Sequence, residues 1–200
     1  MAIDDTAVVS STRGAVFVAE PNTKLPSLKL FSLDADTVGD SGNKYTNIGH
    51  TSVDTLPEFS TDGGDSSTKD TWNKSKFRVT YETVTGKVTI SSVQCDPDML
   101  KLVFDAGDIT GGGVAIALDK VEKKKAVFIY IEDTNAGEKL GFWLPNLSLA
   151  YSELPSLSQD GFNEYKIEGN ILTSTALPKS ASGKATSIGI YPPSVFATAA

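Results

Sequence analysis

Apolar and polar residues alternate along two neighbouring segments, 77–82 and 87–91, which are separated by Thr85-Gly86. A period of two, with β-branched and aromatic residues at the apolar positions, is typical of strands with one buried face. Gly86 can adopt the positive φ that a tight turn needs. The pattern therefore predicts a β-hairpin whose apolar face packs on the core.

A short amphipathic helix is predicted directly after this hairpin, in the run DMLKLVFDAG. Asp96 can accept backbone N–H bonds as the N-cap, and Pro97 suits the first helical position. Apolar residues recur at helical spacing from Met99 to Ala106, and Gly107 is placed to end the helix as its C′ residue. Such a helix must bury its apolar face against a sheet.

Short apolar runs bounded by glycine, proline or charged residues predict further strands along the chain. These runs lie at 15–19, 45–53, 114–118, 126–131, 140–144, 147–151, 165–171 and 188–190. Pro145 is expected to break one strand, whereas the run AVFIYI is apolar on both faces and is expected to be central. About nine strands and one helix predict an all-β fold with one flanking α-helix.

Three segments lack the pattern of a core element. Residues 1–13 are expected to form an N-terminal arm, and residues 192–200 a C-terminal tail. The segment 54–75 is rich in Ser, Thr, Asp and Gly, and is expected to be a long polar loop that is either functional or disordered. We expect a single domain over 1–200 that carries these three extensions.

Charge and cysteine content narrow the functional classes. Eighteen Lys and Arg against 25 Asp and Glu give a formal net charge of −7, which argues against an electrostatic nucleic-acid binder. Cys95 has no partner for an internal disulfide. No signal peptide and no apolar run of about 20 residues is visible, so we expect a soluble protein with no membrane partner.

Candidate catalytic and metal-binding chemistry is sparse. His50 is the only histidine, so neither a Ser-His-Asp triad nor a His/Cys metal site can be assembled with confidence. Gly183-Lys184 lacks the rest of a phosphate-binding loop. Asp62, Asp65 and Asp70 could bind a hard cation, but their spacing fits no calcium loop. We expect no enzyme activity and no cofactor.

The order of these segments resembles the major tail tube proteins of long-tailed bacteriophages, particularly those that infect actinobacteria. The resemblance is carried by GAVFVA, by NIGHTSVD followed by the polar segment, and by Thr71-Trp72 leading into FRVTYETVTGKVTISSVQ. DMLKLVFDAG, YKIEGNIL and the ending IGIYPPSVF also fit. The resemblance implies an antiparallel β-sandwich or partial barrel of about nine strands with a flanking helix.

The resemblance also implies a structural role in the virion tail, after synthesis in the cytoplasm of the bacterial host. Six-fold rings would stack into a tube, through which DNA passes during ejection without specific binding. The expected partners are further copies of the chain and other tail proteins, namely the tape measure, tube terminator and distal tail proteins. An acidic protein suits such a conduit because it repels DNA phosphates.

Two other functional classes remain open at this point. One is a β-sandwich binding or adhesion module, such as a decoration or glycan-binding domain. The other is a small hydrolase whose site the sequence does not reveal.

Contacts between subunits are expected at large apolar residues in the polar segment and the tail. Leu56, Phe59 and Trp72 are expected to dock the segment on an adjacent ring, with Trp72 fixed at its base, Phe59 nearer the partner, and the segment ordering only on assembly. Val195 and Phe196 are expected to cross onto a neighbour.

The polar face of the predicted hairpin is the candidate wall of the channel. Short hydroxyls and mixed charges suit a wet lumen. The lumen-facing candidates are Arg78, Thr80, Glu82, Lys87, Thr89 and Ser91.

Overall fold

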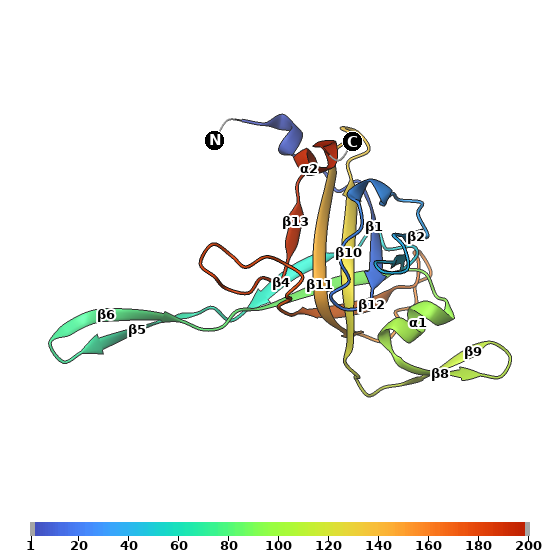
Figure 1. Cartoon of the computed structure of the whole chain (residues 1–200). Helices are drawn as coiled ribbons and strands as arrows, with labels where there is room; N and C mark the ends of the chain where they lie inside the picture. Colours follow the sequence, from blue (N-terminus) through green and yellow to red (C-terminus); the bar gives the residue numbers. More distant parts are fainter. Residues whose placement is uncertain (1–2, 199–200) are drawn as a thin grey trace.

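One antiparallel sheet of nine strands organises the molecule, as seen in a computed structural model that describes residues 3–198 (Figure 1). The strand order is β2-β3-β1-β10-β11-β12-β7-β4, and β13 also pairs with β11. The bounds are β1 Arg13–Ala19, β2 Thr37–Val38, β3 Tyr45–Asn47, β4 Glu58–Asp62, β7 Thr85–Ser92, β10 Lys123–Glu132, β11 Lys139–Tyr151, β12 Tyr165–Ile171 and β13 Gly189–Tyr191. The predicted all-β class is confirmed, and the sheet forms no closed barrel within the described residues.

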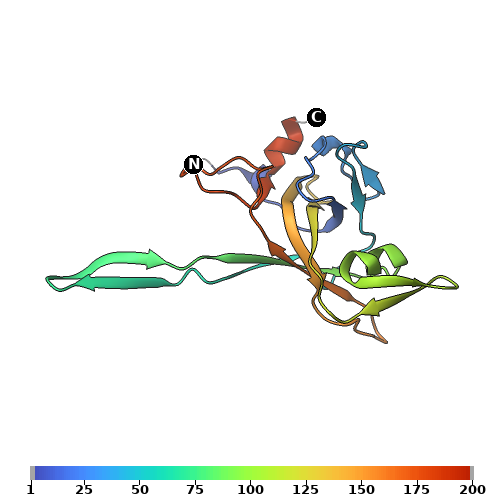
Figure 2. The same cartoon turned by 60° about the horizontal axis from the view of Figure 1, so that its bottom comes forward.

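Two separate hairpins and a few short helices complete the fold. β5 (Ser66–Thr71) pairs with β6 (Lys74–Tyr81), and β8 (Asp105–Ile109) pairs with β9 (Gly113–Ala117). The helices are α1 (Pro97–Val103), α2 (Pro193–Thr198) and the 3-10 turns η1 (Asp5–Ala7) and η2 (Leu28–Leu30). The two hairpins leave opposite sides of the body in both views (Figures 1 and 2).

β10 is the central strand that its two apolar faces predict. Val127 and Ile129 belong to one buried cluster, whereas Phe128 and Tyr130 belong to a second cluster on the other face. A strand with both faces apolar is stable only where both faces are covered. β1 and β11 flank it in antiparallel register and extend both clusters.

The first cluster lies under α1, whose Met99 and Val103 are buried against strand residues together with Phe104. The second cluster is aromatic. Phe31 packs edge-to-face on Phe17, with ring centroids 5.1 Å apart, which is a favoured geometry for aromatic pairs.

A buried polar chain crosses the aromatic cluster. The Trp143 indole donates a hydrogen bond to the Tyr45 hydroxyl at 2.9 Å, and that hydroxyl donates to the Thr23 carbonyl at 2.7 Å. Burial raises the pKa of Tyr45, so the phenol stays neutral. Both polar groups are thereby paired, which removes the cost of burying them.

β11 runs straight through Pro145, so the prediction of a strand break there is wrong. The register between β10 and β11 shifts between Lys125 and Val127, opposite this proline. A bulge leaves a ladder position unpaired, and the missing N–H of proline therefore costs little there. The Pro145 carbonyl is used elsewhere: it accepts the Asn22 N–H at 2.7 Å.

The prediction of a hairpin with its turn at Thr85-Gly86 is also wrong. β6 pairs with β5, whereas β7 pairs with β12 and β4. Thr85 and Gly86 are the first residues of β7 and form no turn. Alternation identified both strands, but it carries no information on which strand pairs with which.

The helix begins as predicted and ends earlier. The Asp96 carboxylate accepts the Met99 N–H at 2.8 Å, whereas α1 ends at Val103 and Gly107 lies inside β8. The Lys123 ammonium donates to the carbonyls of Lys101 and Phe104, at 2.5 and 2.6 Å. A lysine from β10 thus stabilises the helix end that a glycine was expected to terminate.

Both chain ends are tied to the body. The Ser10 N–H donates to the Asp133 carboxylate at 2.9 Å, and the Thr12 hydroxyl to the Glu132 carbonyl at 2.8 Å. The tail forms the unpredicted helix α2. The strand predicted over 45–53 is shorter, because β3 ends at Asn47 and Gly49 has a φ of +89°.

Replacing the helix cap tests how α1 is held. Asp96→Ala should lower the free energy of unfolding by about 1 kcal/mol, measured by urea denaturation, and Asp96→Asn should retain much of the cap. The hydrogen bond from the Met99 N–H lowers the pKa of Asp96. The carboxylate therefore contributes at neutral pH, and the difference between the Asp96→Ala variant and the parent should shrink as pH falls below about 4. A difference that does not vary with pH would contradict this assignment.

Candidate assembly surface

The segment expected to be a polar loop is instead part of a long β-ribbon. β4 and β7 pair at the edge of the main sheet, and the same two chain segments pair again further out as β5 and β6 (Figure 1). Gly63 and Gly64 join β4 to β5 with φ of +82° and +86°. They therefore form the bend at the base of the projecting hairpin and not a loop tip.

Hydrogen bonds within the hairpin hold its register. Ser67 and Thr80 face each other with their hydroxyl oxygens 2.8 Å apart, and the Glu82 N–H donates to the Asp65 carbonyl at 3.0 Å. Near the tip the register shifts, and the Asp70 carboxylate accepts the Lys76 N–H at 2.5 Å. The segment thus has strand structure in a single chain, contrary to the expectation that it orders only on assembly.

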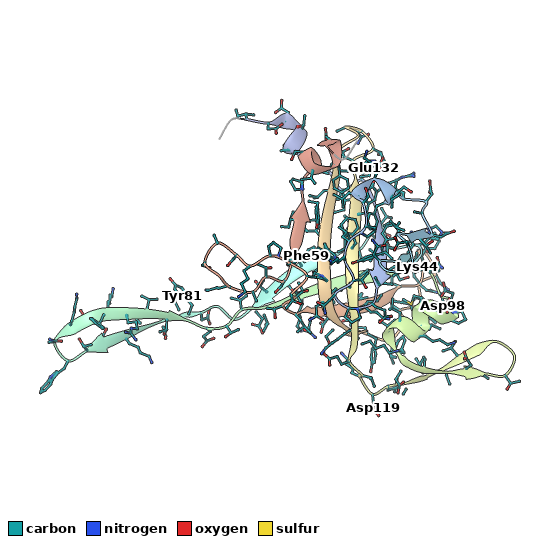
Figure 3. The ribbon with its side chains drawn as sticks, in the orientation of Figure 1. Lys44, Phe59, Tyr81, Asp98, Asp119 and Glu132 are labelled. Carbon is teal, nitrogen blue, oxygen red and sulfur yellow. The ribbon has the colours of Figure 1, made fainter. Side chains whose placement is uncertain are left out.

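The hairpin leaves its apolar side chains in solvent. Phe77, Val79 and Tyr81 share one face of β6 and are 54 %, 49 % and 75 % exposed. Tyr81 lies on the projecting hairpin, away from the body (Figure 3), so the expectation that this face packs on the core is wrong. Trp72 occupies the turn between β5 and β6 and is fully exposed, so its predicted place at the base is also wrong. We call these four residues the apolar stripe. An exposed apolar ribbon of this kind is typical of an interaction surface.

Charge is distributed unevenly between the hairpin and the body. Residues 66–81 contain four Lys or Arg and one Asp, which gives a formal charge of +3. The rest of the chain then carries 14 Lys or Arg against 24 Asp or Glu, a formal charge of −10. A basic projection on an acidic body favours contact with another copy of that body.

The other two predicted anchors lie on the body, remote from the hairpin tip. Phe59 on β4 packs against Phe142 of β11, with ring centroids 5.1 Å apart, and is 37 % exposed. Leu56, 48 % exposed, precedes it. Both line an open hollow of about 630 Å³, here called the apolar groove. The groove is lined further by side chains from β1, β10 and β11, including Val16, Ile129, Ile131 and Leu140.

The predicted contact residues of the tail have different environments. Phe196 of α2 packs on Tyr130 of its own chain, with ring centroids 6.1 Å apart. Val195 is 38 % exposed. A contact of these two residues with a neighbour stays a prediction.

The six lumen candidates do not share one surface. Arg78, Thr80 and Glu82 lie on or beside β6 in the projecting hairpin, whereas the other three lie on β7 in the main sheet. Ser91 is buried, and Lys87 forms an ion pair with Glu168 of β12 at 3.4 Å. Lys87 and Thr89 therefore belong to a polar sheet face that the sequence could not separate from the hairpin.

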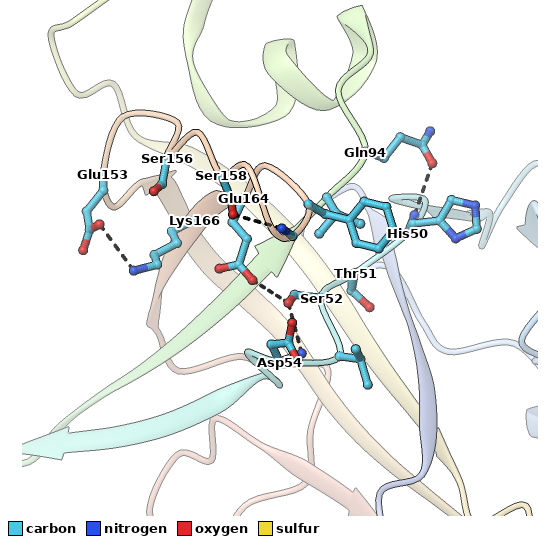
Figure 4. A pocket seen from close by; sticks show the side chains of 14 residues that line it. His50, Thr51, Ser52, Asp54, Gln94, Glu153, Ser156, Ser158, Glu164 and Lys166 are labelled. Atoms are coloured by element: carbon cyan, nitrogen blue, oxygen red, sulfur yellow. Dashed lines mark hydrogen bonds and ion pairs between the residues drawn. The ribbon is translucent and has the colours of Figure 1, made fainter.

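A second hollow, of about 700 Å³, collects the polar residues closest to a catalytic arrangement (Figure 4). The Ser52 hydroxyl donates to the Glu164 carboxylate at 2.5 Å, and the Thr55 hydroxyl also donates to this group. The His50 ring points away from Ser52, while its backbone N–H donates to the Gln94 side chain. These bonds tie the segment after β3 to the segment before β12. The serine contacts a carboxylate and not the His50 imidazole, so the hollow holds no serine–histidine pair.

The described part of the chain has neither a cluster of metal-ligating side chains nor a helix that could span a membrane. Across residues 3–198, no group of three or more His, Cys, Asp or Glu side chains is placed to hold a metal ion. In the same part of the chain, no helix is long and apolar enough to cross a bilayer.

Sequence reasoning missed the second projection, the β8–β9 hairpin. Its turn contains Gly111 and Gly112 with φ of +101° and +94°, and Ile109 beside the turn is half exposed. The triplet Gly111-Gly112-Gly113 is typical of a turn, but residues 105–107 were assigned to the end of the predicted helix, so the first strand of this hairpin was not recognised. The apolar groove was also missed, because it is built from strands far apart in sequence.

Comparison with known proteins decides what this architecture belongs to. A family model described as phage tail tube protein matches residues 1–182.

This chain belongs to the phage tail tube protein family.

Two proteins similar to this tail tube protein come from mycobacteriophages. The major tail protein Gp23 of Mycobacterium phage D29 is 36 % identical over 137 residues, which cover 66 % of this chain and 69 % of that protein. The major tail protein Gp23 of Mycobacterium phage L5 is 34 % identical over the same length and shares. The resemblance inferred from sequence is confirmed, including its actinobacteriophage character. The chain is a structural tail tube component of a phage and not an enzyme.

Removing the hairpin should leave the tail tube protein folded. Both buried clusters form without residues 66–81, so joining Gly64 to Thr83 in place of 65–82 closes β4 on β7 by a short turn. We expect the free energy of unfolding, measured by urea denaturation, to change by less than about 1 kcal/mol. Loss of cooperative unfolding in this deletion variant would show that the hairpin belongs to the core.

Proposed function

We propose that this chain forms six-membered rings that stack into the phage tail tube, and that DNA leaves the capsid through its channel. The observation that carries the proposal is the projecting β5–β6 hairpin with its apolar stripe. In a monomer this stripe contributes nothing to the core and exposes four large apolar side chains. Its burial on a neighbour would convert that exposure into association free energy.

The free edge of the main sheet supports ring formation. Among the described strands, β4 pairs with β7 and ends the sheet on that side. An unpaired edge readily accepts a strand from another chain, and a ring in which each subunit covers the next leaves no edge open. The six-fold symmetry follows the resemblance to tail tube proteins.

The channel wall is proposed to be the polar face of β12, β7 and β4. In their register Thr89 lies between Glu58 and Glu168, and Lys87 lies between Ser60 and Asn170. Hydroxyls, amides and mixed charges on one sheet face give a wet surface that offers DNA phosphates no basic track. This proposal keeps Lys87 and Thr89 on the channel wall. It removes the buried Ser91 and the hairpin residues Arg78, Thr80 and Glu82 from that wall.

The remaining partners are proposed from the tail tube role. Copies of this chain would meet the tape measure protein inside the tube, and the terminator and distal tail proteins at its ends. The mature location is the virion tail, after synthesis in the host cytoplasm.

Electron microscopy tests the tube proposal directly. The purified chain should form six-fold rings and tubes, because the exposed stripe is buried only by assembly. The variant that lacks 65–82 should remain monomeric while its circular dichroism shows a folded sheet. A full-length chain that stays monomeric and binds glycans would instead support a binding or adhesion module.

Thiol labelling tests the channel wall. In a Cys95→Ser background, Thr89→Cys should react readily with a bulky maleimide in free subunits and far more slowly in tubes capped at both ends. The physical reason is that a capped lumen excludes the reagent. Equal rates in free subunits and capped tubes would place Thr89 on the outer surface.

A further inference from the structure

We propose that the hairpin tip of one copy inserts Trp72 into the apolar groove of another copy. This inference rests on the proposed assembly and assigns its two surfaces. The sequence placed three anchors, Leu56, Phe59 and Trp72, on one side of a contact. In this proposal they lie on its two sides: Trp72 is the inserted residue, whereas Leu56 and Phe59 belong to the receiving groove.

The inserting half of the contact is the tip of the projecting hairpin, which holds Trp72 away from its own body. Trp72 sits in the two-residue turn between β5 and β6 and is fully exposed. The Thr71 hydroxyl donates to the Asn73 side chain at 3.0 Å and also contacts the Lys74 carbonyl at 3.2 Å, which fixes the turn that presents the indole. A pre-ordered tip loses less conformational entropy on binding than a flexible loop.

The receiving half is an open apolar site of suitable size. The groove of about 630 Å³ accommodates an indole ring and leaves room for part of the stripe behind it. Its floor includes the buried side chains Val16 and Ile129, and its rim includes Val53 and Leu56. Large aromatic residues seated in apolar pockets contribute most of the binding energy of protein interfaces.

Charge favours another copy of this chain as the occupant. The hairpin carries +3, and the body that contains the groove carries −10. Among the groove's lining residues Asp34 and Arg13 offset each other, so the complementarity is that of the whole hairpin with the whole body. Lys74 follows the tip directly, so a docked tip brings a cation to a body of net negative charge.

The same copy cannot supply both halves. The ribbon of β5 and β6 points away from the body in both views (Figures 1 and 2). The groove is lined by residues of β1, β10 and β11, which belong to the body. Tip and groove are different surfaces, and in the proposed assembly each tip enters the groove of the next copy, so the contact is head-to-tail. Such contacts generate rings or continuing stacks and not isolated two-fold dimers.

Site-directed cross-linking tests the pairing while keeping Trp72 in place. In a Cys95→Ser background, Ser75→Cys, an exposed position three residues after Trp72, is combined with Val53→Cys on the groove rim. The matched control combines Ser75→Cys with Leu157→Cys, because Leu157 is 81 % exposed, close to the 75 % of Val53, and does not line the groove. Both pairs are treated with a short bis-maleimide under conditions in which the parent forms tubes, and covalent multimers are separated by denaturing gel electrophoresis.

The expected result is a ladder of multimers for the groove pair that exceeds the control by about tenfold or more, because docking raises the local concentration of the two thiols. Adding Trp72→Ala should reduce that ladder by about tenfold or more, since an aromatic anchor is lost. Tubes that form without a ladder above the control would overturn this pairing and leave the tube proposal intact. Absence of rings and tubes in the parent would overturn the tube proposal and this inference together.

Discussion

The fold depends on the two apolar faces of β10. A strand that is apolar on both sides cannot lie on a solvent-exposed sheet, so each face requires its own cover. One face is covered with the help of α1, and the other by the aromatic residues that follow β1. Lys123, at the start of β10, also caps the carbonyl end of α1. The helix position, the course of the long segment before β3 and the flanking strands all follow from this one requirement.

Because this core is complete without the hairpin, the hairpin is free to serve another purpose. A two-stranded ribbon alone is at best marginally stable in water, and this one leaves its large apolar side chains exposed to solvent. Within the subunit it is held by its own ladder and by continuity with β4 and β7. Different parts of the molecule therefore serve stability and assembly. The body accounts for the stability of the fold, and the ribbon is available for contact with other copies.

Sequence pattern predicted those elements whose signal is local. The central place of β10, the range of β12 and the capped start of α1 depend on side-chain period or on a motif within one turn, and they were predictable. Strand partners were not, because Thr85-Gly86 reads as a turn whether or not the strands beside it pair. The strand break predicted at Pro145 and the helix end predicted at Gly107 failed because the deciding contacts come from elsewhere in the chain. A bulge opposite Pro145 and the Lys123 side chain near α1 are supplied by β10, which is distant in sequence. The groove, assembled from several strands, had no local signal at all.

The placement of Trp72 apart from Leu56 and Phe59 bears on how the assembly would be controlled. Two bodies of formal charge −10 repel each other, and the +3 of each hairpin offsets part of that repulsion where a tip meets a body. In the proposed assembly, charge would set the orientation before the apolar contact forms, because body-to-body approach is unfavourable. A head-to-tail contact also leaves one tip and one groove unfilled at the two ends of any open series of subunits. In the proposed assembly, growth would continue until a ring closes or another tail protein occupies the last site. The asymmetry of the contact would then both drive assembly and provide a place to stop it.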